Sequence, residues 1–296
     1  IYDVWVAFDE SSCPISLGSF AINEIPYTAI PDANFEAALE ALGYDDVSGD
    51  GQVPTALIEV VTTLDVTNQS ISDLTGISDF TALVDLDCSD NTLTSLDVST
   101  NMNLQTLEFN NNAIASVMLG ANTTLDYIRG RYNQLSTIDI SQNTNLTFLN
   151  LRSNLLTTID VSNNTLLVTI NLRDHSNLTA LDITNNVNLK TLYLQDTDIS
   201  SLDVSQNNLL EILSILRANI TSIDVSNLTA LTQLRISDNN LTGLDVSNNP
   251  ALISLECANN NLTFLNAKNG NNTAILDADF NASGNTALTC ILVDDA

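Results

Sequence analysis

Basic residues are scarce in this chain. It holds 8 lysines and arginines against 36 aspartates and glutamates, and its formal charge at pH 7 is −28. The net charge disfavours nucleic acid and anionic membrane surfaces as partners of the molecule as a whole, so we expect neither. The sequence also lacks an apolar run of about 18 residues, the length that a membrane-spanning helix needs, and we expect no transmembrane segment.

Residues for catalysis are few as well. His175 is the single histidine, and it lies in "NLRDHSNLTAL", where one residue is inserted. It could contact a ligand, but we expect it to lie on a surface bulge. The sequence has no Cys/His metal spacing, no glycine-rich phosphate loop and no G-x-S-x-G elbow. Carboxylate pairs are too plentiful here to identify a glycosidase. We therefore expect a protein that is not an enzyme and needs no cofactor.

What the chain has in abundance is repetition. Close copies of "SLDVSTNMNL" recur along it, for example "TIDISQNTNL" and "GLDVSNNPAL". The leucine that ends each copy recurs every 21 residues, with one step of 22, from Leu83 to Leu252. The whole unit is L-x-x-L-x-L-x-x-N-x-L-x-x-L-D-V-S-x-N. One unit cannot bury its apolar side chains alone, so the units must stack into a solenoid with a continuous core.

This unit resembles the leucine-rich repeat. The resemblance implies a leucine-rich repeat solenoid of the α/β class, mostly β, with a curved parallel β-sheet on its concave face. Before the array, "IPDANFEAALEALGYDD" has apolar residues at helical spacing, Asp32 or Asn34 as N-cap, and Gly43 at its end, which predicts an N-terminal helical cap.

The cap followed by these repeats is similar to extracellular leucine-rich repeat proteins of flavobacteria, and the first repeat resembles that of the internalins. This resemblance implies a secreted or cell-surface protein. The chain begins at Ile1 with no secretory signal before it, and we expect a processed segment. We expect four parts: an extended segment without assigned role at 1–29, the cap at 30–60, the repeat array at 61–276, and a C-terminal cap leading into a further segment at 277–296.

The four cysteines do not predict disulfides. Cys88 and Cys257 occupy the same inward position of two distant repeats, so we expect them to be small core residues. Cys13 and Cys290 lie near opposite ends of the chain, and we expect no bridge between them.

An asparagine recurs where each repeat turns away from its strand. Its side chain can satisfy backbone groups of adjacent turns, so we interpret it as structural. The members of this row are Asn91, Asn112, Asn133, Asn154, Asn239 and Asn260.

An aspartate also recurs, and the row should stack at a spacing of roughly 4.8 Å, where like charges repel. Calcium is one candidate for offsetting the charge; the alternative is hydrogen bonding from Ser, Thr or backbone N–H groups of the same turn. A second calcium candidate is "DVSGDG", with Asp46, Ser48 and Asp50, although Leu57 stands where a calcium loop has glutamate. The aspartate row comprises Asp97, Asp139, Asp160, Asp182, Asp203, Asp224 and Asp245, and Met118 interrupts it.

The few arginines gather in the strand segments. Counting from each repeated leucine places most of them on the concave side, beside aromatic residues, while the register of Arg217 is uncertain by one residue. The arginines could merely neutralise Asp126, Asp174 and Asp196, or they could form a recognition face, since arginine suits carboxylate and sulfate and aromatic rings stack on sugars. The candidate ligand-binding residues are Tyr127, Arg129, Arg131, Tyr132, Phe148, Arg152, Arg173, Tyr193 and Arg235.

These features together favour a non-catalytic extracellular binding or adhesion module. Its concave face would recognise an anionic polysaccharide or a protein at the cell surface. The alternative is a structural spacer or a self-assembling component of a cell-surface layer, filament or outer-membrane complex.

Overall fold

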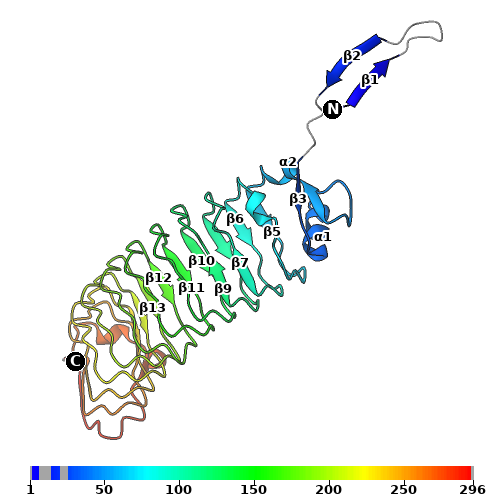
Figure 1. The fold of residues 1–296 in the computed structure, drawn as a ribbon. Helices are drawn as coiled ribbons and strands as arrows, with labels where there is room; N and C mark the ends of the chain where they lie inside the picture. Colours follow the sequence, from blue (N-terminus) through cyan, green and yellow to red (C-terminus); the bar gives the residue numbers. More distant parts are fainter. Residues whose placement is uncertain (1, 7–14, 21–25, 295–296) are drawn as a thin grey trace.

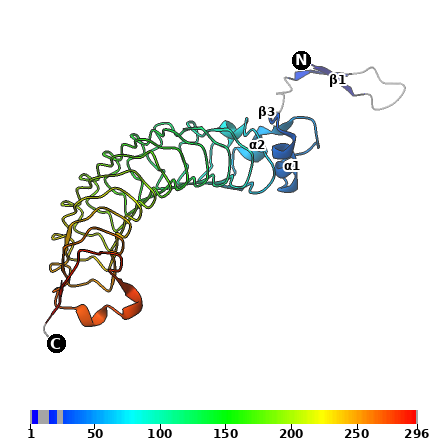
Figure 2. The ribbon, with the colours of Figure 1, turned by 90° about the horizontal axis from the view of Figure 1, so that it is seen from below.

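The computed structural model describes residues 2–6, 15–20 and 26–294, and it is a solenoid that follows an arc (Figures 1 and 2). At the N-terminus, β1 (Tyr2–Val6) pairs with β2 (Ile15–Phe20) in antiparallel fashion. Cys13 lies outside the described residues. None of the helices in the described ranges is long and apolar enough to cross a membrane.

A helical cap covers the first turn of the solenoid. Helix α1 (Ala33–Ala41) begins at Asp32, whose Oδ1 accepts hydrogen bonds from the backbone N–H groups of Asn34 and Phe35 at 2.9 and 3.0 Å. Asp32, and not Asn34, is therefore the N-cap. Its other oxygen accepts from the Ser72 N–H and hydroxyl at 2.8 and 2.7 Å, which ties the helix to the first turn.

The rest of the cap is small. Strand β3 (Tyr27–Ala29) pairs antiparallel with β4 (Gln52–Pro54), and the short helix α2 (Thr55–Ile58) follows at once. The cap packs on the array through its core, where the rings of Phe35 and Phe80 stack with centroids 6.4 Å apart.

One parallel sheet of eleven strands runs along the concave side of the arc. Each strand has three residues, or two in the last, and the middle residue of every three-residue strand is a buried leucine or isoleucine. Because consecutive side chains of a strand point to opposite faces, the residues on either side of this leucine face the concave surface. The strands are β5 (Thr63–Asp65), β6 (Asp85–Asp87), β8 (Thr106–Glu108), β10 (Tyr127–Arg129), β11 (Phe148–Asn150), β12 (Thr169–Asn171), β13 (Thr191–Tyr193), β14 (Ile212–Ser214), β15 (Gln233–Arg235), β17 (Ser254–Glu256) and β19 (Phe280–Asn281).

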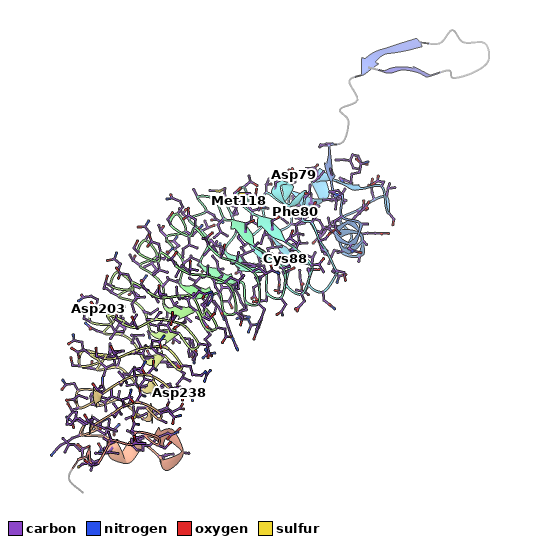
Figure 3. All side chains as sticks on the ribbon, turned by 60° about the horizontal axis from the view of Figure 1, so that its bottom comes forward. Asp79, Phe80, Cys88, Met118, Asp203 and Asp238 are labelled. Carbon is purple, nitrogen blue, oxygen red and sulfur yellow. The ribbon has the colours of Figure 1, made fainter. Side chains whose placement is uncertain are left out.

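The copied "LDV" segments form shorter sheets on the other side of the solenoid. Figure 3 places Met118 and Asp203 along one side, away from Asp238, which follows a strand of the main sheet. Three 3-10 turns connect parts of the array: η1 (Ile77–Asp79), η2 (Asn272–Ala274) and η3 (Asp277–Asp279). The strands of this side are β7 (Ser95–Asp97) with β9 (Ser116–Met118), and β16 (Gly243–Asp245) with β18 (Phe264–Asn266) and β20 (Ile291–Leu292).

The repeat extends beyond its expected limit at residue 276. Strand β19 pairs with β17 and strand β20 pairs with β18, so the segment expected to be a C-terminal cap adds one more turn to both sheets. Cys88 and Cys257 are fully buried free thiols, which confirms them as core residues. Full burial of each core leucine or isoleucine stabilises the fold by about 1.5–3 kcal/mol.

The recurrent asparagines hold successive turns together. Asn154 is 4% exposed; its Oδ1 accepts from the Leu135 N–H at 3.0 Å, and its Nδ2 donates to the carbonyls of Gly130 and Leu151 at 2.8 Å each. Asn133 and Asn260 make equivalent bonds. The structural interpretation of this row is confirmed.

The expectation for His175 is wrong. It is 1% exposed and takes the place that Asn154 holds one turn earlier, with its Nδ1 3.1 Å from the Leu172 carbonyl oxygen. Thr197 and Ala218 occupy the same place in the next two turns, so the row is interrupted three times before Asn239 resumes it. Burial lowers the pKa of His175 from its ordinary value.

A second row of buried asparagines closes the copied motif. The amide nitrogen of each donates to backbone carbonyls of the preceding turn, as Asn164 does to Ile140 and Asn143 at 3.0 and 2.8 Å. In one repeat a buried leucine, Leu228, replaces the asparagine. The copied part of the repeat therefore serves the solenoid itself, and its members are Asn101, Asn122, Asn143, Asn164, Asn186, Asn207 and Asn249.

Candidate ligand-binding face

The structure brings most of the candidate residues together on the concave surface of strands β10 to β13 and the turns that follow them. These strands are adjacent and in register, so Tyr127 lies beside Phe148 and Asn171 beside Tyr193. Arg235 lies apart on β15, two strands beyond β13. We call the assembled set the central face; it comprises Tyr127, Arg129, Arg131, Tyr132, Phe148, Arg152, Arg173 and Tyr193.

Aromatic rings form a platform at one end of the central face. The rings of Tyr127 and Phe148 stack with centroids 4.3 Å apart and an angle of 6° between their planes. The guanidinium of Arg129 lies 5.3 Å from the Tyr127 centroid and 5.8 Å from that of Phe148, within the range of a cation–π contact. Both rings are partly exposed, so the platform is open to solvent on the concave side.

Four of the six arginines pair with carboxylates. This is what the charge-neutralising interpretation predicts, and it holds for Asp174 and Asp196, whereas Asp126 takes part in no ion pair within the described ranges. Burial alone would raise the pKa of Asp174, but hydrogen bonds from Arg152 and Ser153 outweigh it and lower that pKa. The pairs are Arg129–Glu108 at 3.3 Å, Arg152–Asp174 at 2.7 Å, Arg217–Asp196 at 2.6 Å and Arg235–Glu256 at 3.1 Å.

The register of Arg217 is settled by its backbone. It has a positive φ of 51° and lies in the turn after β14, at the place that Tyr132 and Asp196 hold in their own repeats. It is therefore not a strand residue, and the prediction of strand positions is also wrong for Arg131, Arg152 and Arg173, which follow β10, β11 and β12.

Arg131 and Arg173 differ from the other four. The Nε of Arg131 donates to the Asn110 Oδ1 at 3.3 Å, and the Nε of Arg173 donates to the Gln195 side-chain oxygen. Neither forms an ion pair with a carboxylate of the described chain. The Arg173 guanidinium also lies 4.0 Å from the centroid of Tyr193. The terminal N–H groups of both arginines donate to no residue of the described chain.

A shallow hollow of about 270 Å³ surrounds Arg173. The ion pairs Arg152–Asp174 and Arg217–Asp196 form its walls, so three guanidiniums face two carboxylates and one positive charge is left over. An anionic group entering this hollow would meet the forked donor of Arg173.

The concave surface changes sign along the sheet. Strands β5, β6 and β8 carry Asp65, Asp85, Asp87 and Glu108, and the first arginine follows on β10. The arginines of the main sheet therefore begin at its middle strands.

The aspartate row follows the hydrogen-bonded alternative. In each turn the Oδ1 accepts the backbone N–H of the residue two positions later, as Asp160 does from Ser162 at 2.9 Å. Hydrogen bonds from the side chain and then the backbone of Ser162 lower the pKa of Asp160, and Ser141 acts on Asp139 in the same way. The equivalent bonds in the other turns reach Asp97, Asp139, Asp182, Asp203, Asp224 and Asp245.

The residues of the second calcium candidate point to separate partners. Asp46 accepts from the Tyr27 hydroxyl at 3.1 Å, Ser48 donates to Glu40 at 2.8 Å, and Asp50 accepts from the Gln52 N–H at 3.1 Å. Within the described part of the chain, no three His, Cys, Asp or Glu side chains come close enough to hold a metal ion.

Comparison with known proteins supports the fold. No protein-family profile matches the sequence, and a search of curated proteins found no significant match. Among solved structures, the chain is similar to the functional domain of InlJ from Listeria monocytogenes, which is described as including a cysteine ladder. The two share 31% sequence identity with a TM-score of 0.68, and the match covers 93% of this chain and 63% of that domain. The chain thus spans less than two thirds of the InlJ domain.

Two eukaryotic receptor structures share the fold at 19% identity and a TM-score of 0.60. One is the plant peptide hormone receptor RGFR1 in complex with RGF2, with 81% of this chain and 44% of that chain covered. The other is the Toll–Spatzle complex of Drosophila, with 71% and 34% covered. The protein is therefore a leucine-rich repeat solenoid, similar in structure to a bacterial protein of that fold.

Proposed function

We propose that the protein is a non-catalytic extracellular binding module whose central face takes up an anionic ligand. The observation that carries the proposal is the pair of arginines, Arg131 and Arg173, that face the concave surface without a carboxylate partner. The chain has 36 acidic residues, and four of its six arginines are paired with them. Two unpaired arginines in one small region are therefore exceptions that call for an external anion.

The arrangement of these arginines also has an energetic cost in the free protein. Arg131, Arg152 and Arg173 occupy the same position in successive turns, since the Arg152 carbonyl accepts from the residue after Arg131 and the Arg173 carbonyl accepts from the residue after Arg152. Like charges on adjacent strands repel. Asp174 forms its ion pair with Arg152, and a bound anion would offset the charge that remains on the other two.

The comparisons support a binding role at the level of the fold. RGFR1 is seen with RGF2 and Toll with Spatzle, so both receptors engage a partner. The similarity to InlJ and the resemblance to secreted bacterial proteins favour an extracellular location. A rigid spacer, the alternative role, would have no use for unpaired arginines on its inner face.

Paired substitutions with the same charge change test the proposal. Arg131→Gln/Arg173→Gln removes the two unpaired charges, and Lys190→Gln/Arg235→Gln removes two that pair with Glu211 and Glu256. Binding to immobilised heparin and poly-L-glutamate would be measured at low ionic strength by biolayer interferometry. Because a hydrogen bond to a charged group contributes about 1.5–3 kcal/mol, the first variant should lose at least tenfold in affinity.

The control should stay within about threefold of the wild type, since it changes only the long-range field. Equal losses in the two variants would mean that binding is unspecific attraction. No binding of the wild type to heparin, to poly-L-glutamate or to an alginate oligosaccharide would reject the proposed function.

A further inference from the structure

Two amide groups at the centre of the face have nothing to donate to. Asn150 and Asn171 are register partners on β11 and β12, and they are 8% and 7% exposed. Their Oδ1 atoms accept from the backbone N–H groups of Arg152 and Arg173, at 3.3 Å each. Their Nδ2 groups donate to no residue of the described chain and are not among its buried unsatisfied atoms, so they are open to the concave surface.

Comparable amides nearby are satisfied. The Nδ2 of Asn110 donates to the Ser89 hydroxyl at 3.0 Å, and the Nε2 of Gln195 donates to the Ser214 hydroxyl at 2.7 Å. Among the buried amides of the described residues, the unpartnered donors are thus confined to β11 and β12. Asn150 lies between the buried Leu149 and Leu151, so its side chain faces the concave surface.

Aromatic rings lie on both sides of these amides. The Tyr127–Phe148 platform adjoins Asn150, since Phe148 lies on the same strand, and Tyr193 on β13 is the register partner of Asn171. The rings carry polar neighbours, because Arg129 contacts the platform and Arg173 contacts Tyr193. Flat apolar surfaces next to hydrogen-bond donors suit a ligand with apolar ring faces and polar edges.

The arginines without a carboxylate partner lie beside the same rings and amides. Arg131 and Arg173 belong to turns two repeats apart, and the strand spacing puts their backbones roughly 10 Å from each other across the sheet. Acidic side chains on one face of an extended peptide recur at roughly 7 Å, which does not match this separation. Acidic groups two sugar units apart in an extended polysaccharide fit it better.

We propose that the ligand is an acidic polysaccharide that crosses strands β10 to β13. This inference rests on the proposed function and names its ligand class. The sugar rings stack on the Tyr127–Phe148 platform and on Tyr193. The acidic groups, carboxylates of uronates or sulfates, bind Arg131 and Arg173, and oxygen atoms of the sugars accept hydrogen bonds from the Nδ2 groups of Asn150 and Asn171.

The test uses the full chain and four probes: an alginate oligosaccharide with carboxylates alone, a heparin oligosaccharide with sulfates, poly-L-glutamate, and neutral dextran. Asn150→Leu/Asn171→Leu removes the donors, together with the Oδ1 acceptors, and keeps the branched shape of the side chain. Asn150→Asp/Asn171→Asp keeps the Oδ1 acceptors, so it guards against loss of the fold. Phe148→Leu removes half of the platform, and Asn145→Leu, at an exposed position of the same repeat, is the matched control.

We expect alginate or heparin to bind and dextran not to bind. Which of the two binds shows whether the acidic group of the ligand is a carboxylate or a sulfate. Both Asn double variants and Phe148→Leu should weaken binding at least tenfold, with Asn145→Leu unchanged and circular dichroism unaltered. Poly-L-glutamate bound as tightly as the polysaccharides, with no effect of Asn150→Leu/Asn171→Leu or Phe148→Leu, would overturn this inference and leave the proposed function standing. No binding of alginate, heparin or poly-L-glutamate would overturn both this inference and the proposed function.

Discussion

Replacing Asn154 by alanine should destabilise the solenoid strongly, because one side chain serves two turns. The substitution leaves the Leu135 N–H and the Leu151 carbonyl without their hydrogen bonds, while the Gly130 carbonyl keeps a longer one from Asn133 at 3.4 Å. A buried polar group left unsatisfied costs about 1–3 kcal/mol. Two such groups predict a loss of about 3–4 kcal/mol in the free energy of unfolding.

Urea unfolding followed by far-ultraviolet circular dichroism measures this loss. With a denaturant slope of about 2 kcal/mol per molar, the midpoint should fall by about 1.5–2 M. Asn163→Ala is the matched control, since Asn163 is exposed and makes one hydrogen bond, to the Ser141 carbonyl at 3.2 Å. We expect the control to change the free energy by less than about 0.5 kcal/mol.

The reasoning would be refuted by equal effects of the two substitutions at an unchanged slope. That result would mean that the buried asparagines are not what joins neighbouring turns, and that leucine packing alone sets the stability of the array.

Three further predictions concern single residues. Burial lowers the pKa of His175, so the unfolded chain binds a proton at this residue before the folded chain does as the pH falls below about 6.5. The free energy of unfolding should therefore decline from that pH toward pH 5. His175→Asn should abolish this decline, as measured by the urea midpoint. Iodoacetamide should label the exposed Cys290 in the native protein, whereas Cys257, whose pKa burial raises to about 12, should react only after unfolding, as read by peptide mass spectrometry. Gly120→Ala should lower the melting temperature more than Gly270→Ala: both positions have positive φ, which costs alanine roughly 1–2 kcal/mol, but at Gly120 the new Cβ would also lie 2.4 Å from a backbone oxygen of the preceding turn.

The repeat period accounts for how much of the fold could be predicted. Leucines at a fixed step specify a stacked core whatever the intervening residues are, so the sheet and the inward cysteines followed from counting. The same counting would have corrected the prediction for His175, because this residue stands 21 positions after Asn154 and so belongs to the asparagine row. The inserted residue comes after His175 and does not move it to the surface.

The ion pairs of two arginines could have been predicted from the residues that lie one repeat period before or after them in the sequence. Arg129 has Glu108 and Arg235 has Glu256 at a distance of 21 residues, and each forms an ion pair there. Arg131 has Asn110 and Arg152 at that distance, so no acid is at hand. Residues one period apart lie side by side, which makes this a physical signal and not a coincidence of sequence.

The unpartnered amides of Asn150 and Asn171 could not be read from the sequence. Asparagine occurs throughout the repeat, and whether its Nδ2 group is satisfied depends on side-chain orientation and on the hydroxyl groups near it. Asn110 finds Ser89, but Asn150 and Asn171 have no such neighbour in the described structure. Only the three-dimensional arrangement distinguishes them.

The most direct test of the central face is the nuclear magnetic resonance spectrum of the arginine side chains. The chain has six arginines, so their Nε–H groups give a spectrum simple enough to assign by substitution. Titration with the acidic oligosaccharide that binds should shift the Nε–H signals of Arg131 and Arg173 and leave that of Arg235 in place. Equal shifts of all six signals, or shifts confined to Arg217 and Arg235, would contradict the assignment of the ligand to strands β10 to β13.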